Sequence, residues 1–194
     1  MSVVTEKSPS RQKLFNVPNQ LTAARLLLSL VLFVLIALQY YLSATVVFLV
    51  AASTDWLDGY WARKYGQVTN LGRILDPFVD KIIICGTFVF LVAVPDSGVE
   101  AWMAVVVVGR ELLVTALRSF LEGEGADFSA SMSGKIKMVL QCLAVGLALF
   151  ALYYGSPRPE GLQWAVVISI WAAVLMTIYS GAAYARRAIV LLRG

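Results

Sequence analysis

The chain consists of long apolar stretches separated by short polar connections. A helix needs roughly 20 apolar residues to cross a bilayer, and stretches of about that length occupy 21–40, 42–63, 74–94, 100–121, 135–154 and 162–185. Hydrophobic residues make up 59% of the sequence and charged residues 14%, a balance far too apolar for a soluble domain. These features predict an all-α integral membrane protein with six transmembrane helices, forming a single domain over residues 1–194.

The two sets of helix ends differ in charge. One set of ends, together with the N-terminal segment, holds many basic residues: Lys7, Arg11, Lys13, Arg63, Lys64, Arg73, Arg118, Lys135, Lys137, Arg186, Arg187 and Arg193. The connections at the opposite set of ends hold Arg158 together with the acidic residues Asp96, Glu100 and Glu160. Because cytoplasmic loops carry the excess of Lys and Arg, we expect both termini to be cytoplasmic. Residues 1–17 would form a cytoplasmic N-terminal segment with a short interfacial stretch.

Charge and residue types also exclude several functions. The net charge is +4, but the basic residues are dispersed over helix ends rather than gathered into a soluble patch, so we expect no nucleic-acid partner. The chain has no histidine, and Cys85 and Cys142 lie singly within apolar stretches. Thiol-imidazole zinc sites and Ser-His or Cys-His catalysis are therefore excluded.

Four aspartates interrupt the second and third apolar stretches: Asp55, Asp58, Asp76 and Asp80. Residues three or four apart share a helical face, so Asp55 projects with Asp58, and Asp76 with Asp80. The short connection between the two stretches predicts that the helices are antiparallel neighbours, so we expect all four carboxylates to converge near the cytoplasmic surface. Gly59 removes side-chain bulk where a ligand would approach.

Ligation by carboxylate oxygens suits Mg²⁺ or Mn²⁺, which keep open positions for water and substrate phosphate. We expect two such ions at the site, clamping a diphosphate for phosphoryl or phosphatidyl transfer. One alternative is that the acids only form ion pairs, with Arg63, Lys64, Arg73 and Lys81. A second alternative is a divalent-cation transporter, although transporters bury their acids near the midplane, often with broken helices and an internal repeat.

The aspartates also carry a family resemblance. The run Asp55-Trp-Leu-Asp58-Gly59-Tyr-Trp-Ala62-Arg63, followed by Gly72-Arg-Ile-Leu-Asp76-Pro-Phe-Val-Asp80, resembles the complete signature of the CDP-alcohol phosphotransferases, also called CDP-alcohol phosphatidyltransferases. The resemblance implies a six-helix fold, a homodimer, and a reaction in which an alcohol displaces CMP from a CDP-linked lipid during phospholipid biosynthesis.

The resemblance assigns roles residue by residue. Asp55, Asp58 and Asp76 would bind metal, and Asp80 would bind metal and accept the proton of the attacking hydroxyl. The segment from Asn19 to Arg25 resembles the opening segment of the family. The implied contacts to CDP-diacylglycerol are Asn19, Thr22, Arg25, Gly59, Arg63, Thr69 and Gly72. For Asn19 and Thr22, helix capping is the alternative.

A group of basic residues favours an acceptor that itself carries a phosphate. Arg110 and Arg118 lie two helical turns apart on one face of the predicted helix 100–121, and Lys135 lies at the cytoplasmic start of the predicted helix 135–154. Arginine binds phosphate in a bidentate manner and lysine as a point charge. We therefore expect Arg110, Arg118 and Lys135 to bind the acceptor phosphate. The alternative is that Arg118, Lys135 and Lys137 face anionic lipid headgroups.

Three blocks narrow the resemblance to the bacterial phosphatidylglycerophosphate synthase branch. They are Arg110-Glu111 with Arg118, Gly134-Lys135-Ile-Lys137 with Gln141, and Asn16-Val-Pro-Asn19-Gln-Leu-Thr22. Met138 departs from the branch pattern, which has threonine there. The resemblance implies transfer from CDP-diacylglycerol to sn-glycerol 3-phosphate at the bacterial inner membrane, with the active site cytoplasmic. Inositol phosphate, phosphatidylglycerol and serine are the alternative acceptors, and serine would leave the basic residues without a phosphate.

Overall fold

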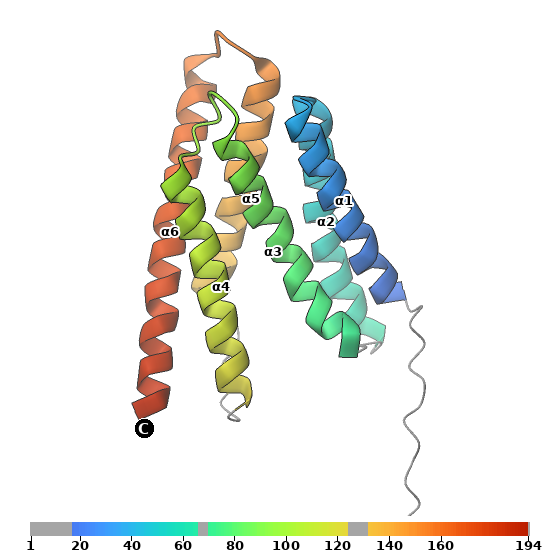
Figure 1. Cartoon of the computed structure of the whole chain (residues 1–194), viewed down its shortest axis with the longest axis vertical. Helices are drawn as coiled ribbons and strands as arrows, with labels where there is room; N and C mark the ends of the chain where they lie inside the picture. Colours follow the sequence, from blue (N-terminus) through green and yellow to red (C-terminus); the bar gives the residue numbers. More distant parts are fainter. Residues whose placement is uncertain (1–16, 66–69, 124–131, 194) are drawn as a thin grey trace, which may run out of the picture.

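The computed structural model describes residues 17–65, 70–123 and 132–193 (Figure 1). Within these ranges the side chains of 17–19, 21–22, 54–65, 70–77, 80, 122 and 192–193 lie outside the description. The described backbone forms six helices and no strand. They are α1 (Val17–Ala37), α2 (Tyr41–Tyr65), α3 (Asn70–Val92), α4 (Ala101–Gly123), α5 (Met132–Tyr154) and α6 (Glu160–Arg193). The all-helical fold predicted from the sequence is therefore confirmed.

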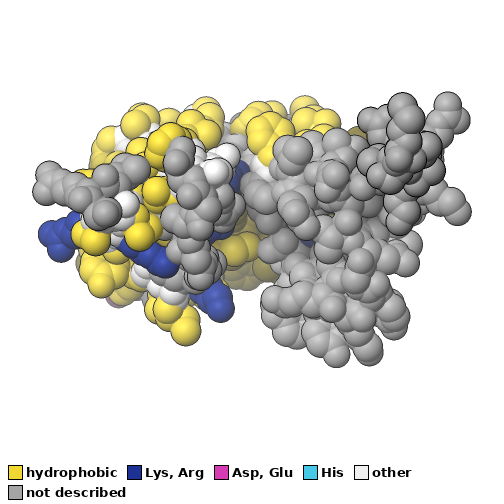
Figure 2. All heavy atoms as spheres, turned by 90° about the horizontal axis from the view of Figure 1, so that it is seen from below, with side chains coloured by type: hydrophobic (Ala, Val, Ile, Leu, Met, Phe, Trp, Pro, Cys, Tyr) yellow, Lys and Arg dark blue, Asp and Glu magenta, His cyan; other side chains and the backbone are white. Residues whose placement is uncertain are grey.

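Successive helices alternate in direction, so the connections gather at two ends of the bundle (Figure 1). We call the lower end in Figure 1 the basic end; it holds the start of α1, the α2–α3 and α4–α5 junctions, and the end of α6. Figure 2 looks at this end and shows Lys and Arg side chains on the side of α4 and α6. Of the basic residues that the sequence placed at one set of helix ends, those with described side chains on α4, α5 and α6, namely Arg118, Lys135, Lys137, Arg186 and Arg187, lie on the halves of these helices nearer this end. Lys7, Arg11 and Lys13 lie outside the described residues.

At the end opposite the basic end, specific residues terminate the helices. Gln39 follows α1 with a φ of 62°, and Gly155 follows α5 with a φ of 80°; a left-handed residue is a common helix terminator. The backbone N–H of Tyr40 donates to the carbonyl of Leu35 over 2.8 Å, which closes the end of α1. Arg158 donates to the carbonyl oxygens of Gly155 and Asp96, and so joins the α5–α6 turn to the α3–α4 turn.

The main apolar core has members on all six helices, and a second, smaller cluster of Val114, Leu121, Tyr184 and Ala188 lies between α4 and α6. Among its largest fully buried side chains are Phe48 of α2, Phe88 of α3 and Leu149 of α5. Helix α1 packs against α2 and α3, whereas α5 packs against α2, α3 and α6, and α4 lies between α3 and α6. Helices α2 and α3, which carry the aspartates, therefore share two neighbours, α1 and α5.

The outer surface is apolar as well. Large hydrophobic side chains are exposed on every helix, for example Leu27, Val46, Val89, Val105, Val139 and Ile168. Within the described residues, Met132–Tyr154 and Glu160–Leu191 are long and apolar enough to cross a membrane. Shorter apolar stretches lie at Ala23–Ala37, Tyr41–Ser53 and Lys81–Val92. A protein apolar both inside and outside is suited to lipid rather than water. Among the described residues, these two helices combine the length and the apolar composition of a full span.

Candidate active site at the basic end of the bundle

The aspartates of the signature lie on the helix segments that flank the α2–α3 junction. Asp55 and Asp58 belong to α2, and Asp76 and Asp80 belong to α3. The backbone is helical at all four positions, as the spacing argument required, and residues 66–69 alone join the two helices. Both pairs are therefore carried toward the basic end, where the junction lies (Figure 1). The donor type, four carboxylates, fits a hard divalent cation.

The side chains of this set lie outside the described part of the chain, so metal ligation by Asp55, Asp58, Asp76 and Asp80 stays a prediction. Among the described residues, no group of three or more acidic, cysteine or histidine side chains is placed to hold a metal. Several of the expected CDP-diacylglycerol contacts also lie outside the described part of the chain. Thr69 lies outside the described residues, as do the side chains of Asn19, Thr22 and Arg63 and the surroundings of Gly59 and Gly72.

Arg25 is the one expected CDP-diacylglycerol contact whose side chain is described. It lies on α1 and is only 3% exposed. Its helix, α1, packs against both aspartate-bearing helices, α2 and α3. The buried side chain of Arg25 therefore lies on a helix that contacts both of them. A buried arginine in an apolar helix needs anionic or polar partners.

A cluster of buried charges links α4 to α5. The carboxylate of Glu111 contacts Arg110 Nη1 at 3.2 Å and accepts a short hydrogen bond from Lys137 Nζ. All three side chains are less than one-tenth exposed. We call Arg110, Glu111 and Lys137 the charge cluster. Within the charge cluster, two cations share one carboxylate, and a bound anion would balance the second positive charge.

Helix α6 completes the surroundings of Arg110. The Nε of Arg110 donates to Ser180 Oγ over 3.1 Å, and its guanidinium lies 5.4 Å from the centre of the Tyr184 ring. The hydroxyl of Tyr184 accepts from Arg118 Nη2 at 3.4 Å. The Nε of Arg118 is buried and has no hydrogen-bond partner among the described residues. A buried donor of this kind is available to an anionic ligand.

Polar side chains extend the cluster to the neighbouring helices. Lys81 of α3 donates a short hydrogen bond to Thr115 Oγ1 of α4, and Thr115 in turn donates to the carbonyl of Glu111. On the other side, Gln141 of α5 is fully buried and donates to Thr177 Oγ1 of α6 over 2.9 Å. Polar contacts between described side chains thus tie α3, α4, α5 and α6 together around the charge cluster.

The two lysines at the start of α5 have different environments. Lys135, expected to bind the acceptor phosphate, is exposed, whereas Lys137 is buried against Glu111. Residues two apart on a helix point in nearly opposite directions, so the packing of α5 decides which lysine enters the bundle. The sequence spacing agrees with the burial of Lys137, because Lys137 and Gln141 are four residues apart, share a helical face and are both buried. Phosphate binding by Lys135 stays a prediction.

The sequence-based reasoning missed the contribution of α6. It gave no site role to any residue of that helix, yet Ser180 and Tyr184 contact the two arginines expected to bind phosphate. The available signal was the polar pattern within the apolar stretch, because Thr177, Ser180 and Tyr184 fall on one helical face. Small polar residues within membrane helices are common, however, and do not by themselves indicate a site.

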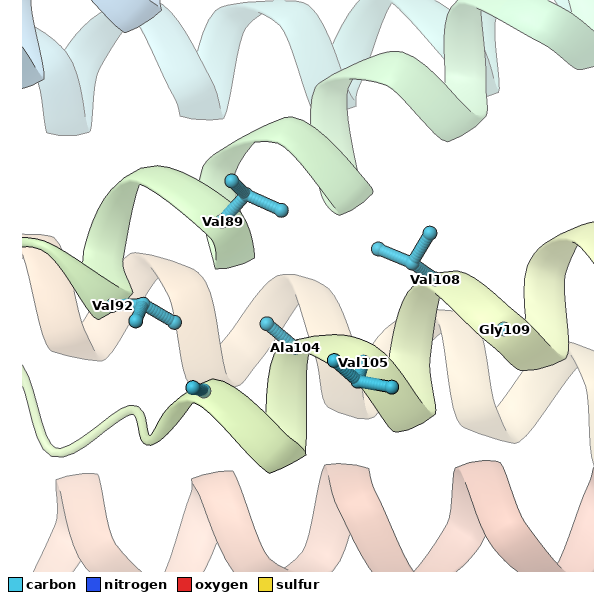
Figure 3. Close-up of a pocket in the computed structure, with 7 residues that line it drawn as sticks. Val89, Val92, Ala104, Val105, Val108 and Gly109 are labelled. Carbon is cyan, nitrogen blue, oxygen red and sulfur yellow. The ribbon is translucent and has the colours of Figure 1, made fainter.

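An apolar groove between α3 and α4 is distinct from this polar region (Figure 3). Its volume is about 450 Å³. Its lining has no charged side chain and consists of Val89, Val92, Ala101, Ala104, Val105, Val108 and Gly109. A groove of this composition offers nothing to a phosphate or a metal, so the charge cluster and the aspartate-bearing helix ends remain the candidate active site.

Comparison with known proteins agrees with the signature. The family model for CDP-alcohol phosphatidyltransferase matches residues 15–179. A relative from Bacillus subtilis, named CDP-diacylglycerol--glycerol-3-phosphate 3-phosphatidyltransferase, is 33% identical, with 88% of this chain and 94% of the relative covered. A relative of the same name from Haemophilus influenzae is also 33% identical, over 86% of this chain and 89% of the relative.

A third relative, from Mycobacterium tuberculosis, has the name "Probable phosphatidylglycerophosphate synthase". It is 34% identical, and the match covers 95% of this chain and 87% of the relative. The family model spans both aspartate-bearing helices and the charge cluster. This chain therefore belongs to the CDP-alcohol phosphatidyltransferase family.

Proposed function

We propose that the protein is a phosphatidylglycerophosphate synthase. It would transfer the phosphatidyl group of CDP-diacylglycerol to sn-glycerol 3-phosphate, giving phosphatidylglycerophosphate and CMP. The names of the relatives support this reaction, since those from Bacillus subtilis and Haemophilus influenzae have glycerol 3-phosphate in their printed names. The family membership also favours a transferase over the divalent-cation transporter considered from the sequence.

The observation that carries the choice of acceptor is the buried charge cluster. Arg110 and Lys137 share one carboxylate, and Arg118 has a buried Nε without a protein acceptor among the described residues. This excess of positive charge is suited to a second anion besides the CDP-linked diphosphate. Glycerol 3-phosphate and inositol phosphate supply such an anion, whereas serine does not. We propose Arg110, Arg118 and Lys135 as the residues that bind the acceptor phosphate.

The reaction replaces the phosphoanhydride bond of CDP-diacylglycerol with a phosphodiester bond to the acceptor. A hydroxyl oxygen of glycerol 3-phosphate attacks the phosphorus that bears the diacylglycerol, and the bond from that phosphorus to the CMP oxygen breaks. Asp80 would accept the hydroxyl proton, and CMP leaves with the electron pair of the broken bond. Asp55, Asp58, Asp76 and Asp80 would hold Mg²⁺ or Mn²⁺, two ions per site, which neutralise charge on the diphosphate when bound.

The remaining proposed contacts hold the nucleotide lipid. Asn19, Thr22 and Arg25 would approach it from α1, and Gly59, Arg63, Thr69 and Gly72 from the signature. The burial of Arg25 next to α2 and α3 supports its part in this set. The acyl chains would stay in the bilayer.

We further propose that all six helices cross the bacterial inner membrane, with both termini and the active site in the cytoplasm. The alternating helix directions support an even number of crossings, and the basic side chains at one end of the bundle support the orientation (Figures 1 and 2). A homodimer is the proposed assembly, as the family resemblance implies.

Product analysis tests this function. Purified protein is incubated with CDP-diacylglycerol, Mg²⁺ and isotope-labelled glycerol 3-phosphate, and the lipid products are identified by mass spectrometry. We expect the label in phosphatidylglycerophosphate with wild-type protein, and loss of product with Asp80→Asn, because the amide cannot accept the proton. Asp96→Asn is the matched control, since this exposed aspartate lies in the α3–α4 turn at the opposite end of the bundle. Wild-type turnover by Asp80→Asn would remove Asp80 as the base.

A further inference from the structure

One face of α6 carries an unusual set of residues for an apolar helix. Thr177, Ser180, Gly181 and Tyr184 are spaced by three and four residues, so they share a face. Thr177 and Ser180 are fully buried and Tyr184 is 3% exposed. This face packs against α4, the helix that carries Arg110 and Arg118. We call Ser180, Gly181 and Tyr184 the α6 seat.

Each member of the α6 seat constrains Arg110 in a different way. Ser180 Oγ accepts from the Nε of Arg110 and donates its own proton to the carbonyl of Thr177, so its lone pairs face the arginine. A Cβ on Gly181 would lie 3.1 Å from Arg110 Cγ, so glycine leaves the room in which the arginine stem lies. The ring of Tyr184 lies beneath the guanidinium.

These contacts leave one side of Arg110 available. Its Nε is engaged by Ser180 and its Nη1 by Glu111, whereas its Nη2 makes no hydrogen bond within the described residues. A guanidinium that is fixed in the protein and still has donors to offer is suited to bind an oxyanion in a defined orientation. The α6 seat therefore sets the direction from which the acceptor phosphate is bound.

Tyr184 also links Arg110 to Arg118. Its ring lies under the first arginine, and its hydroxyl accepts from the second at 3.4 Å. Tyr184 thus contacts two arginines, Arg110 and Arg118, that lie two helical turns apart on α4. Moving Tyr184 would change both the position of Arg110 and the separation of the two guanidinium groups.

We propose that the α6 seat is a positioning surface that aligns Arg110 and Arg118 for the phosphate of the acceptor, and so contributes to acceptor affinity. This inference rests on the proposed function. The family model ends at residue 179, so Ser180, Gly181 and Tyr184 lie just beyond the segment that the model matches.

Steady-state kinetics of CMP release distinguish a positioning role from a structural one. We expect Tyr184→Leu to raise the KM for glycerol 3-phosphate about tenfold, equivalent to about 1.4 kcal/mol of binding, because it removes the ring and the hydroxyl together. Tyr184→Phe keeps the ring under Arg110 and should raise this KM by less. For both variants the KM for CDP-diacylglycerol and kcat stay within about twofold of wild type, since neither variant touches the signature helices.

Gly181→Ala gives an independent test that removes no hydrogen bond. The added methyl meets Arg110 Cγ, so this variant should also raise the KM for glycerol 3-phosphate selectively, and it carries the test if Tyr184→Leu does not fold. Tyr179→Leu is the matched control, because Tyr179 lies on the same helix but is 64% exposed. We expect wild-type kinetics from it.

The outcomes separate this inference from the proposed function. Wild-type protein that releases no CMP with glycerol 3-phosphate would overturn the function, and the inference with it. If the wild type is active, an unchanged KM for glycerol 3-phosphate in Tyr184→Leu and Gly181→Ala overturns the α6 seat alone. Equal losses in the KM for both substrates, or in kcat, would show that α6 only supports the fold.

Discussion

Replacing Glu111 should destabilise the protein strongly. Its carboxylate is the shared partner of Arg110 and Lys137, and all three side chains are less than one-tenth exposed. Glu111→Leu removes the only negative charge of the charge cluster and leaves two buried cations together. Removing one partner of a buried ion pair costs about 3–5 kcal/mol, because the remaining charge is left uncompensated.

The pairing can be measured with a double-mutant cycle on Glu111→Leu and Lys137→Met. The free energy of unfolding in detergent micelles is determined for both single variants and for the double variant. We expect the double variant to be more stable than the sum of the single effects by about 1–3 kcal/mol, since losing both charges leaves fewer uncompensated groups than losing one.

The control for this cycle is Glu160→Leu, which removes an exposed acid at the start of α6 and should cost less than about 1 kcal/mol. Additive effects of Glu111→Leu and Lys137→Met, within about 0.5 kcal/mol, would show that the two side chains are not coupled. The description of the charge cluster would then be wrong.

Three further predictions concern the metal, the phosphate site and the packing of the bundle. Removing divalent cations with a chelator should abolish CMP release, and adding Mg²⁺ or Mn²⁺ should restore it, if carboxylates hold the metal; activity in excess chelator would refute metal dependence. Arg110→Lys should raise the KM for glycerol 3-phosphate about tenfold or more, because lysine keeps the charge but loses the planar donor set; an unchanged KM would place the acceptor elsewhere. Gly86→Ala should lower the free energy of unfolding by about 1–3 kcal/mol, because a Cβ there would lie 2.2 Å from the Phe33 ring. Gly161→Ala, which meets no atom within 4 Å, is the control, and equal stability of the two variants would contradict the packing of α1 on α3.

The helical fold was accessible from the sequence because the apolar stretches are long and their polar breaks are sharp. The positions of the helix ends were harder to predict from the sequence. The sixth helix was expected to stop near residue 185, whereas α6 continues to Arg193. The expectation followed the apolar stretch, which stops where Arg186 and Arg187 begin, but a helix supplies its own backbone hydrogen bonds and need not stop at a membrane surface.

The candidate site was only partly accessible. The spacing of the aspartates identified the signature without a structure, because that pattern is local. The partners of Arg110 are not local: Lys137 and Ser180 come from α5 and α6, and they meet Arg110 or Glu111 only through helix packing. Sequence reasoning therefore chose Lys135 over Lys137, although Lys137 is the lysine that packs against Glu111.

The measurement that tests the account most directly is CMP release by the purified protein with CDP-diacylglycerol and Mg²⁺ or Mn²⁺, compared across four acceptors: glycerol 3-phosphate, inositol phosphate, serine and phosphatidylglycerol. We predict release that is selective for glycerol 3-phosphate. Selective release with serine or phosphatidylglycerol would contradict the proposed phosphate site, and folded protein that releases no CMP with any acceptor would contradict the transferase function itself.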